Sequence, residues 1–124
     1  MIDRSKPVPE AGQQISPLSA KQRMAPTAPL FSLGQTVATP GALRLLAKFN
    51  VSPVNLLCRH ISGDWGDLEI CDRHTNNLAL VNGDRLLSSY AVDGSKREDP
   101  SGARVWVITE WDRSVTTLLL PSEY

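Results

Sequence analysis

Two short runs of consecutive apolar residues, Val105–Ile108 and Leu118–Leu120, lie in the last third of the chain. They are rich in β-branched, aromatic and aliphatic residues, which is typical of strands. A strand with one buried face alternates apolar and polar residues, and these runs do not. We therefore expect cover on both faces. Helices would supply one side, and the N-terminal segment, a second copy of the chain or a partner would supply the other.

Three strands are predicted in this part of the chain, at Leu86–Val92, Ala103–Thr109 and Val115–Leu120. The intervening segments contain turn-forming residues, namely Asp93 to Gly102 and then Asp112-Arg113-Ser114. Short strands separated in this way favour an antiparallel meander.

Helix signals come before the strands. A short strand at Gln35–Ala38 leads to Thr39-Pro40, an N-cap followed by proline at the first helical position. Ser52-Pro53 repeats this start signal. Each is followed by apolar residues at i, i+3, i+4 and i+7, as on one face of a helix. These residues are Ala42, Leu45, Leu46 and Phe49 in the first helix, and Val54, Leu57, Cys58 and Ile61 in the second.

A third helix is predicted at Asp67–Asn82, with Gly83 in the left-handed position that ends many helices. Its apolar side is weaker, so we expect it to be half exposed. The predicted fold class is therefore α+β: a short strand, three helices, then a three-stranded antiparallel meander.

The N-terminal segment has a different composition. Five of the nine prolines fall within residues 1–30, without apolar periodicity, so we predict a disordered Pro-rich arm. A partner-binding arm is the alternative, and Met24 offers a second translation start. The remainder, 31–124, is predicted to be a single small α+β domain.

The charge and apolar pattern narrow the function classes. The 13 basic and 13 acidic residues cancel, so no global field draws the chain to nucleic acid or to a membrane. No signal peptide or membrane-spanning run is present. We predict a cytoplasmic protein with free thiols at Cys58 and Cys71, and no cofactor. A protein partner or self-association is expected. Binding to nucleic acid is not favoured by the charge and would need a local patch, and no membrane partner is expected.

The segment from His60 to Asp67 is the first candidate site. His60 and Asp64 could form an acid–base pair, since imidazole titrates near neutrality and a carboxylate can orient it. Trp65 and Asp67 could form a recognition surface. The structural alternative makes Asp67 a helix N-cap and places Trp65 in the core.

The second candidate is the stretch from Thr109 to Thr117. Arg113 with Thr116 and Thr117 could bind an anion such as phosphate. The alternative is that Asp112-Arg113-Ser114 only forms a hairpin turn. A combined catalytic hypothesis would use His60, Asp64, Arg113 and Thr117.

Cys58, His60, Cys71 and His74 have the ligand count of a structural zinc site. Residues 58 and 60 are two apart on a predicted helix, so their side chains diverge. No metal site is predicted for this reason.

The stretch from Phe31 to Tyr124 resembles a family of short uncharacterised proteins of bacterial plasmids and other mobile elements. The segments that carry the resemblance are Gly34–Ala42, His60–Leu68, Arg85–Tyr90 and Val107–Pro121. The resemblance implies a bacterial mobile-element setting and supplies no mechanism. The insert from Asp93 to Gly102 is longer than expected for the family, which indicates a peripheral loop.

Helices followed by an antiparallel meander is also the layout of barnase-like and RelE-like ribonucleases, although a fold does not fix a function. The leading hypothesis is a non-catalytic accessory protein that acts by protein–protein contacts and self-associates. The alternatives are a small ribonuclease-type toxin and an anti-restriction or anti-defence inhibitor.

Overall fold

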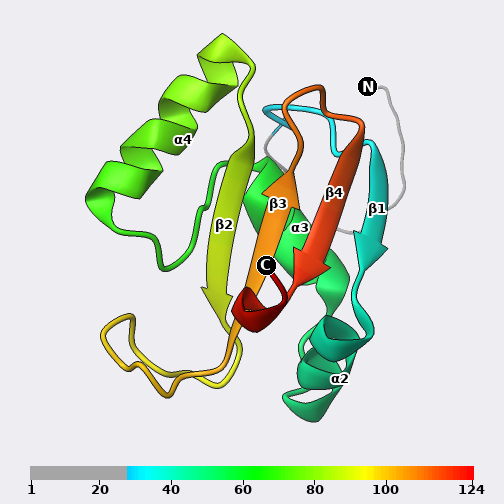
Figure 1. Ribbon diagram of the computed structural model, residues 1–124, viewed down its shortest axis with the longest axis vertical. Coiled ribbons are helices and arrows are strands. Elements are labelled where there is room, and N and C mark those ends of the chain that lie inside the picture. Colours follow the sequence, from blue (N-terminus) through cyan, green and yellow to red (C-terminus); the bar gives the residue numbers. More distant parts are fainter. Residues whose placement is uncertain (1–27) are drawn as a thin grey trace, which may run out of the picture.

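The computed structural model describes residues 28–124 (Figure 1). The predictions of a disordered arm and of a second start at Met24 fall on residues outside this range, apart from residues 28–30. The elements, in chain order, are β1 (Gln35–Ala38), α2 (Pro40–Lys48), α3 (Pro53–Ile61), α4 (Ile70–Asn82), β2 (Leu86–Ala91), β3 (Arg104–Thr109), β4 (Val115–Leu119) and the 3₁₀ turn η1 (Pro121–Glu123). The α+β class and the predicted order of a strand, three helices and three strands are confirmed.

The four strands form one sheet in the order β1-β4-β3-β2 (Figure 1). β2, β3 and β4 are consecutive antiparallel neighbours, which is the predicted meander. β1 extends it by pairing parallel to β4, with Gln35 opposite Val115, so the sheet is mixed. Three helices and two strands thus separate β1 from β4 along the chain, although the two strands are neighbours in the sheet.

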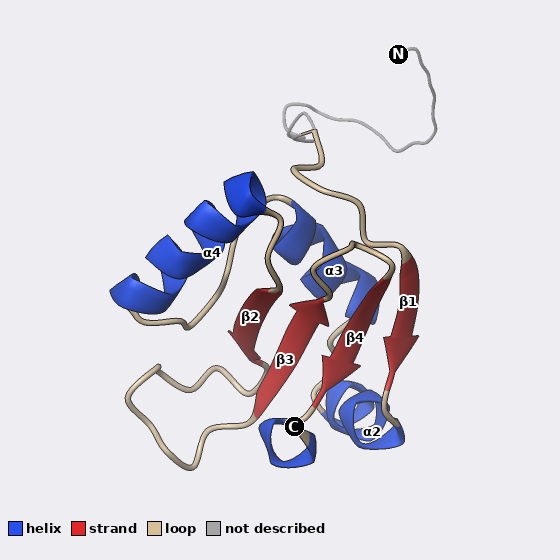
Figure 2. Cartoon of the chain, turned by 45° about the horizontal axis from the view of Figure 1, so that its top comes forward, coloured by secondary structure: helices blue, strands red, loops and turns tan. Residues whose placement is uncertain are grey.

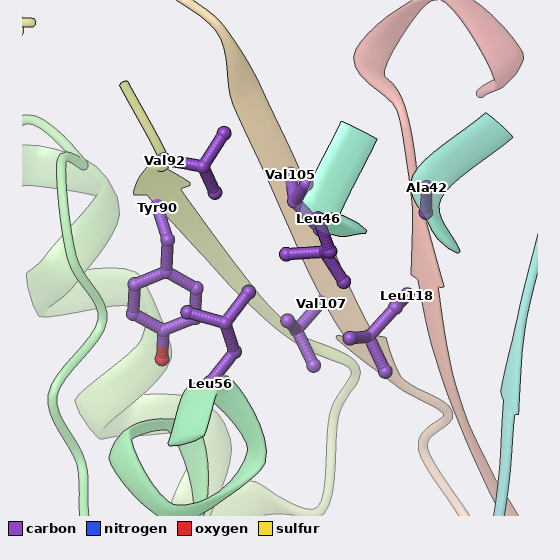
Figure 3. Close-up of a cluster of buried hydrophobic side chains, with 8 residues drawn as sticks. All are labelled: Ala42, Leu46, Leu56, Tyr90, Val92, Val105, Val107 and Leu118. Carbon is purple, nitrogen blue, oxygen red and sulfur yellow. The ribbon is translucent and has the colours of Figure 1, made fainter. Parts of the chain in front are cut away.

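One face of the sheet packs against α2 and α3. Figure 3 shows the cluster of buried side chains that joins them, with Leu46 from α2 and Leu56 from α3 directed toward the strands. Successive residues of a strand point to opposite faces, so Trp106 and Ile108 lie on the other side of the sheet. There η1 and Tyr124 give partial cover, and the Trp106 and Tyr124 rings meet with their centroids 5.6 Å apart. The expected cover on both faces is therefore substantial on one side and partial on the other.

The helix ends follow the predicted signals with one correction. The Thr39 hydroxyl accepts a hydrogen bond from the Ala42 N–H (3.1 Å), and Gly83 ends α4 at φ 75°. Asp67 is not the N-cap of the third helix, because α4 begins only at Ile70, after Glu69. The Asp67 N–H donates instead to the Ser89 carbonyl (2.6 Å).

The outer edge of β2 is covered by a side chain of α4 and by the loop that precedes α4. The Asn76 amide of α4 donates to the Leu87 carbonyl (2.5 Å) and accepts from the Leu87 N–H (3.2 Å). Two residues after Leu87 on β2, Ser89 forms a parallel bridge with Gly66. Gly66 has φ +76°, and a Cβ there would collide with the Ser89 carbonyl oxygen, so this close approach requires glycine. Within residues 28–124, β1 is left as the unpaired edge of the sheet.

Candidate functional site

His60 lies at the centre of the predicted site, but it is fully buried between α3 and the sheet. Its Nδ1 is 2.6 Å from the Ser88 Oγ, and its Nε2 is 2.9 Å from the Thr109 Oγ1. The rings of Phe31 and Trp65 enclose it, with centroids 5.2 Å and 5.7 Å from that of the imidazole. His60 therefore occupies a packed interior.

The hydrogen bonds around His60 form a chain with a defined direction. The Thr116 hydroxyl donates to the Leu33 carbonyl (2.7 Å), so it can only accept from the Thr109 hydroxyl (2.7 Å). The Thr109 hydroxyl donates its one proton to Thr116, so its oxygen must accept from the His60 Nε2–H. The Nδ1 of His60 then accepts from Ser88. The contacts assign the Nε2–H tautomer and give both ring nitrogens a partner.

Burial and, as a smaller contribution, the positive charge of Arg113 together lower the pKa of His60 to about 4. The imidazole is therefore neutral at neutral pH. A neutral ring with both nitrogens engaged by buried hydroxyls has no free lone pair or proton for a substrate. His60 ties α3 to β2 and β3, and through Thr116 to β4 and the segment before β1.

Asp64 does not orient His60. Its Oδ2 accepts from the Arg59 Nε (2.7 Å), and its Oδ1 accepts from the Gly66 N–H (3.1 Å). Burial raises the pKa of Asp64, but these hydrogen bonds and the Arg59 charge outweigh it, so the pKa lies below its ordinary value. The Arg59 guanidinium also stacks 4.5 Å from the centroid of the Tyr90 ring. The predicted His60–Asp64 acid–base pair is not formed.

The guanidinium of Arg113 is also engaged in hydrogen bonds within the protein. It sits in the hairpin turn at φ 59° and donates to the carbonyls of Asp84 (2.6 Å), Glu110 (3.1 Å) and Ala79 (3.2 Å). The Ala79 carbonyl lies in the last turn of α4, where it also accepts from the Gly83 N–H (2.9 Å) and the Asp84 N–H (3.2 Å). The guanidinium therefore connects the hairpin to the end of a helix, as the turn interpretation favours, and its bonds are directed at backbone rather than at an anion.

Thr117 lies on the other face of the sheet from His60. Thr116 is the buried neighbour that joins the His60 chain, and Thr117 pairs with Ile108, whose side chain lies on the opposite face. His60, Asp64, Arg113 and Thr117 are therefore not brought together in one open site.

The structural alternative is right for Trp65, which lies in the core, and wrong for Asp67, which is not a helix N-cap. Trp65 is buried, and its indole N–H donates to the Asn77 Oδ1 (3.0 Å), so it is a core residue and offers no recognition surface. The Asp67 Oδ2 lies 3.1 Å from the Arg104 Nε, which ties the loop before α4 to the start of β3.

The four possible zinc ligands do not come together in one group. Cys58 and Cys71 are free and exposed on different helices, His74 is exposed on α4, and His60 is buried. In the described part of the chain, no group of three or more His, Cys, Asp or Glu side chains is placed to hold a metal ion. None of the described helices is long and apolar enough to cross a bilayer.

Sequence reasoning missed a cavity of about 310 Å³ on the sheet face opposite α2 and α3. Its floor consists of three apolar side chains from β2 and β3: Leu87, Trp106 and Ile108. On its rim, the Arg85 Nη2 donates to the Tyr124 hydroxyl (2.7 Å), and Asp72 of α4 adds a carboxylate. An apolar floor with a few polar groups at the edge is typical of a binding site. We name this site the sheet groove. The consecutive apolar residues Val105–Ile108 could have indicated it, because they place apolar side chains on both faces of the sheet.

Protein-family models, curated proteins and solved structures were compared with the chain, and none of the three comparisons gave a match.

Proposed function

We propose that the protein is a non-catalytic accessory protein of a bacterial mobile element, which acts in the cytoplasm through protein contacts and self-association. The observation that carries the proposal is the sheet groove. Two helices cover one face of the sheet, and on the other face Trp106 is partly accessible in the apolar floor of the groove. The buried, fully hydrogen-bonded His60 supports a binding role over a catalytic one.

The partner that fits the sheet groove is a polypeptide segment with an apolar side chain and a basic residue beside it. The apolar side chain would contact Leu87, Trp106 and Ile108. The basic residue would lie near the Asp72 carboxylate at the rim. Residues 28–124 carry nine basic and eleven acidic side chains, and this net charge of −2 also favours a basic partner. Aromatic residues such as Trp106 and Tyr124 are enriched among those that dominate binding energy at interfaces.

The test is affinity capture from bacterial cells with three versions of the full chain. These are the wild type, Trp106→Glu in the groove, and Trp111→Glu as the matched control, because Trp111 is an exposed tryptophan in the β3–β4 turn. We expect a partner that the wild type and Trp111→Glu retain and Trp106→Glu loses, and whose binding segment is apolar and basic. A partner retained equally by all three, or none with the wild type, would overturn the groove as the contact site.

A further inference from the structure

Helix α4 carries apolar side chains on the side that faces away from the sheet. Ile70 is 74% exposed, Leu78 51% and Val81 83%. Cys71 and His74 lie between them and are also exposed. Figures 1 and 2 show α4 beside the β2 edge, and among the described elements none lies against its outer side. Contiguous exposed apolar side chains of this kind mark interaction surfaces.

The exposed residues follow the spacing of a helix–helix seam. Asn76 and Ala79 are the buried residues of α4 and define its inner side. On the outer side, Cys71, His74, Leu78 and Val81 are separated by three, four and three residues, which is the a/d pattern of a coiled coil. We name these four residues the outer stripe.

The spacing of the outer stripe is symmetric about position 76, so an antiparallel second copy of α4 would match it position for position. When two antiparallel copies of α4 meet across a two-fold axis, Cys71 lies opposite Val81 of the second copy, and His74 lies opposite its Leu78. A two-fold interface needs such a self-complementary surface. The residues of α4 directly beside the stripe, Thr75, Asn77 and Asn82, carry no charge. The charged side chains near the stripe, Glu69, Arg73 and Arg97, lie around its Cys71 end.

We infer that two copies of the chain associate through an antiparallel α4–α4 contact along the outer stripe. The inference deepens the self-association in the proposed function and rests on it. α4 has 13 residues and is therefore about 20 Å long. One such helix pair is smaller than the roughly 800 Å² per partner of a standard interface, so the dimer is expected to be reversible, with Kd on the order of micromolar or weaker.

Sedimentation velocity of the full chain over a range of concentrations tests the contact. Val81→Asp places a charge in the seam at an exposed position, and Val54→Asp is the matched control on α3, where Val54 is 63% exposed. We expect the average mass of the wild type and of Val54→Asp to rise with concentration, and that of Val81→Asp to stay at the monomer value. Far-ultraviolet circular dichroism should be the same for all three.

Disulfide trapping tests the antiparallel arrangement. In a Cys58→Ser background, Val81→Cys places a thiol opposite Cys71 of the second copy, and oxidation should give a covalent dimer. Cys71 alone should not cross-link, because two Cys71 residues in this arrangement are about 15 Å apart along the helix axis, beyond disulfide reach. Arg73→Cys, outside the stripe, is the control and should not cross-link either.

The outcomes separate this inference from the proposed function. A wild type that stays monomeric at every concentration would refute self-association and the α4 contact together. A dimer that Val81→Asp leaves intact, or that cross-links through Cys71 alone, would refute the α4 contact and keep self-association. Capture of a partner at the sheet groove tests the groove contact of the proposed function separately, because Trp106 lies on the sheet and outside the stripe.

Discussion

The burial of His60 predicts a pH dependence of stability that one substitution should remove. The folded state holds the His60 pKa at about 4, while an unfolded chain has the ordinary value of about 6.5. Between these values the unfolded state binds more protons than the folded state, so the free energy of unfolding rises with pH. This contribution is fully present above about pH 6.5 and is lost as the pH falls toward about 4.

The two pKa values set the size of the effect. From about pH 7.5 to about pH 5, the wild type should lose about 2 kcal/mol of unfolding free energy through His60 alone. His60→Gln removes the titrating group, so this part of the pH dependence should disappear. The substitution should also cost about 1–3 kcal/mol at neutral pH, because Ser88 or Thr109 is left buried without its partner.

Urea unfolding at the two pH values, followed by circular dichroism, measures the difference for each protein. The chain has two histidines, and His74→Gln, which removes the exposed one, is the matched control and should retain the wild-type difference. Carboxylates contribute equally to all three proteins and cancel in the comparison. If wild type and His60→Gln lose the same free energy, or if an NMR titration gives His60 an ordinary pKa, the reasoning is wrong.

Two further predictions concern backbone contacts that single residues hold. Arg113→Ala should destabilise the fold by about 1–3 kcal/mol and speed hydrogen exchange in the last turn of α4, because the hydrogen bonds of the guanidinium to Ala79 and Asp84 are lost. Arg113→Lys should restore only part of the lost stability. Equal exchange in wild type and Arg113→Ala would contradict this. Gly66→Ala should cost about 2–4 kcal/mol in chemical unfolding, whereas Gly94→Ala, at a similar φ of +78° but in open space, should cost only about 1 kcal/mol. Equal costs would show that the approach to Ser89 is not tight.

The sheet groove, whose floor is on β2 and β3, adjoins the outer stripe on α4 at Thr75, which lines the groove and lies beside the stripe. Asp72 at the groove rim and the stripe residues lie on different sides of α4. Under the two proposals, a dimer through α4 would therefore leave both grooves free to bind a partner. Two linked grooves would strengthen binding to a partner that presents two copies of its segment, without any new contact.

The amino-acid sequence by itself determined the features that depend on neighbouring residues. Thr39-Pro40 started α2, Gly83 ended α4, and Asp112-Arg113-Ser114 formed the turn between β3 and β4, because capping and turn bonds span only a few residues. The strand and helix order followed from the same local patterns.

The tertiary structure alone decided which distant residues meet. His60 bonds Ser88 and Thr109, which are 28 and 49 residues away, and Thr116 reaches Leu33 across 83 residues. No local pattern distinguishes Thr116, which faces His60, from Thr117, which faces the other side of the sheet. That choice depends on the register of β3 and β4, and a shift by one residue would exchange the two faces. The parallel pairing of β1 with β4 and the closure of His60 from solvent likewise arise only when α3 packs against the assembled sheet.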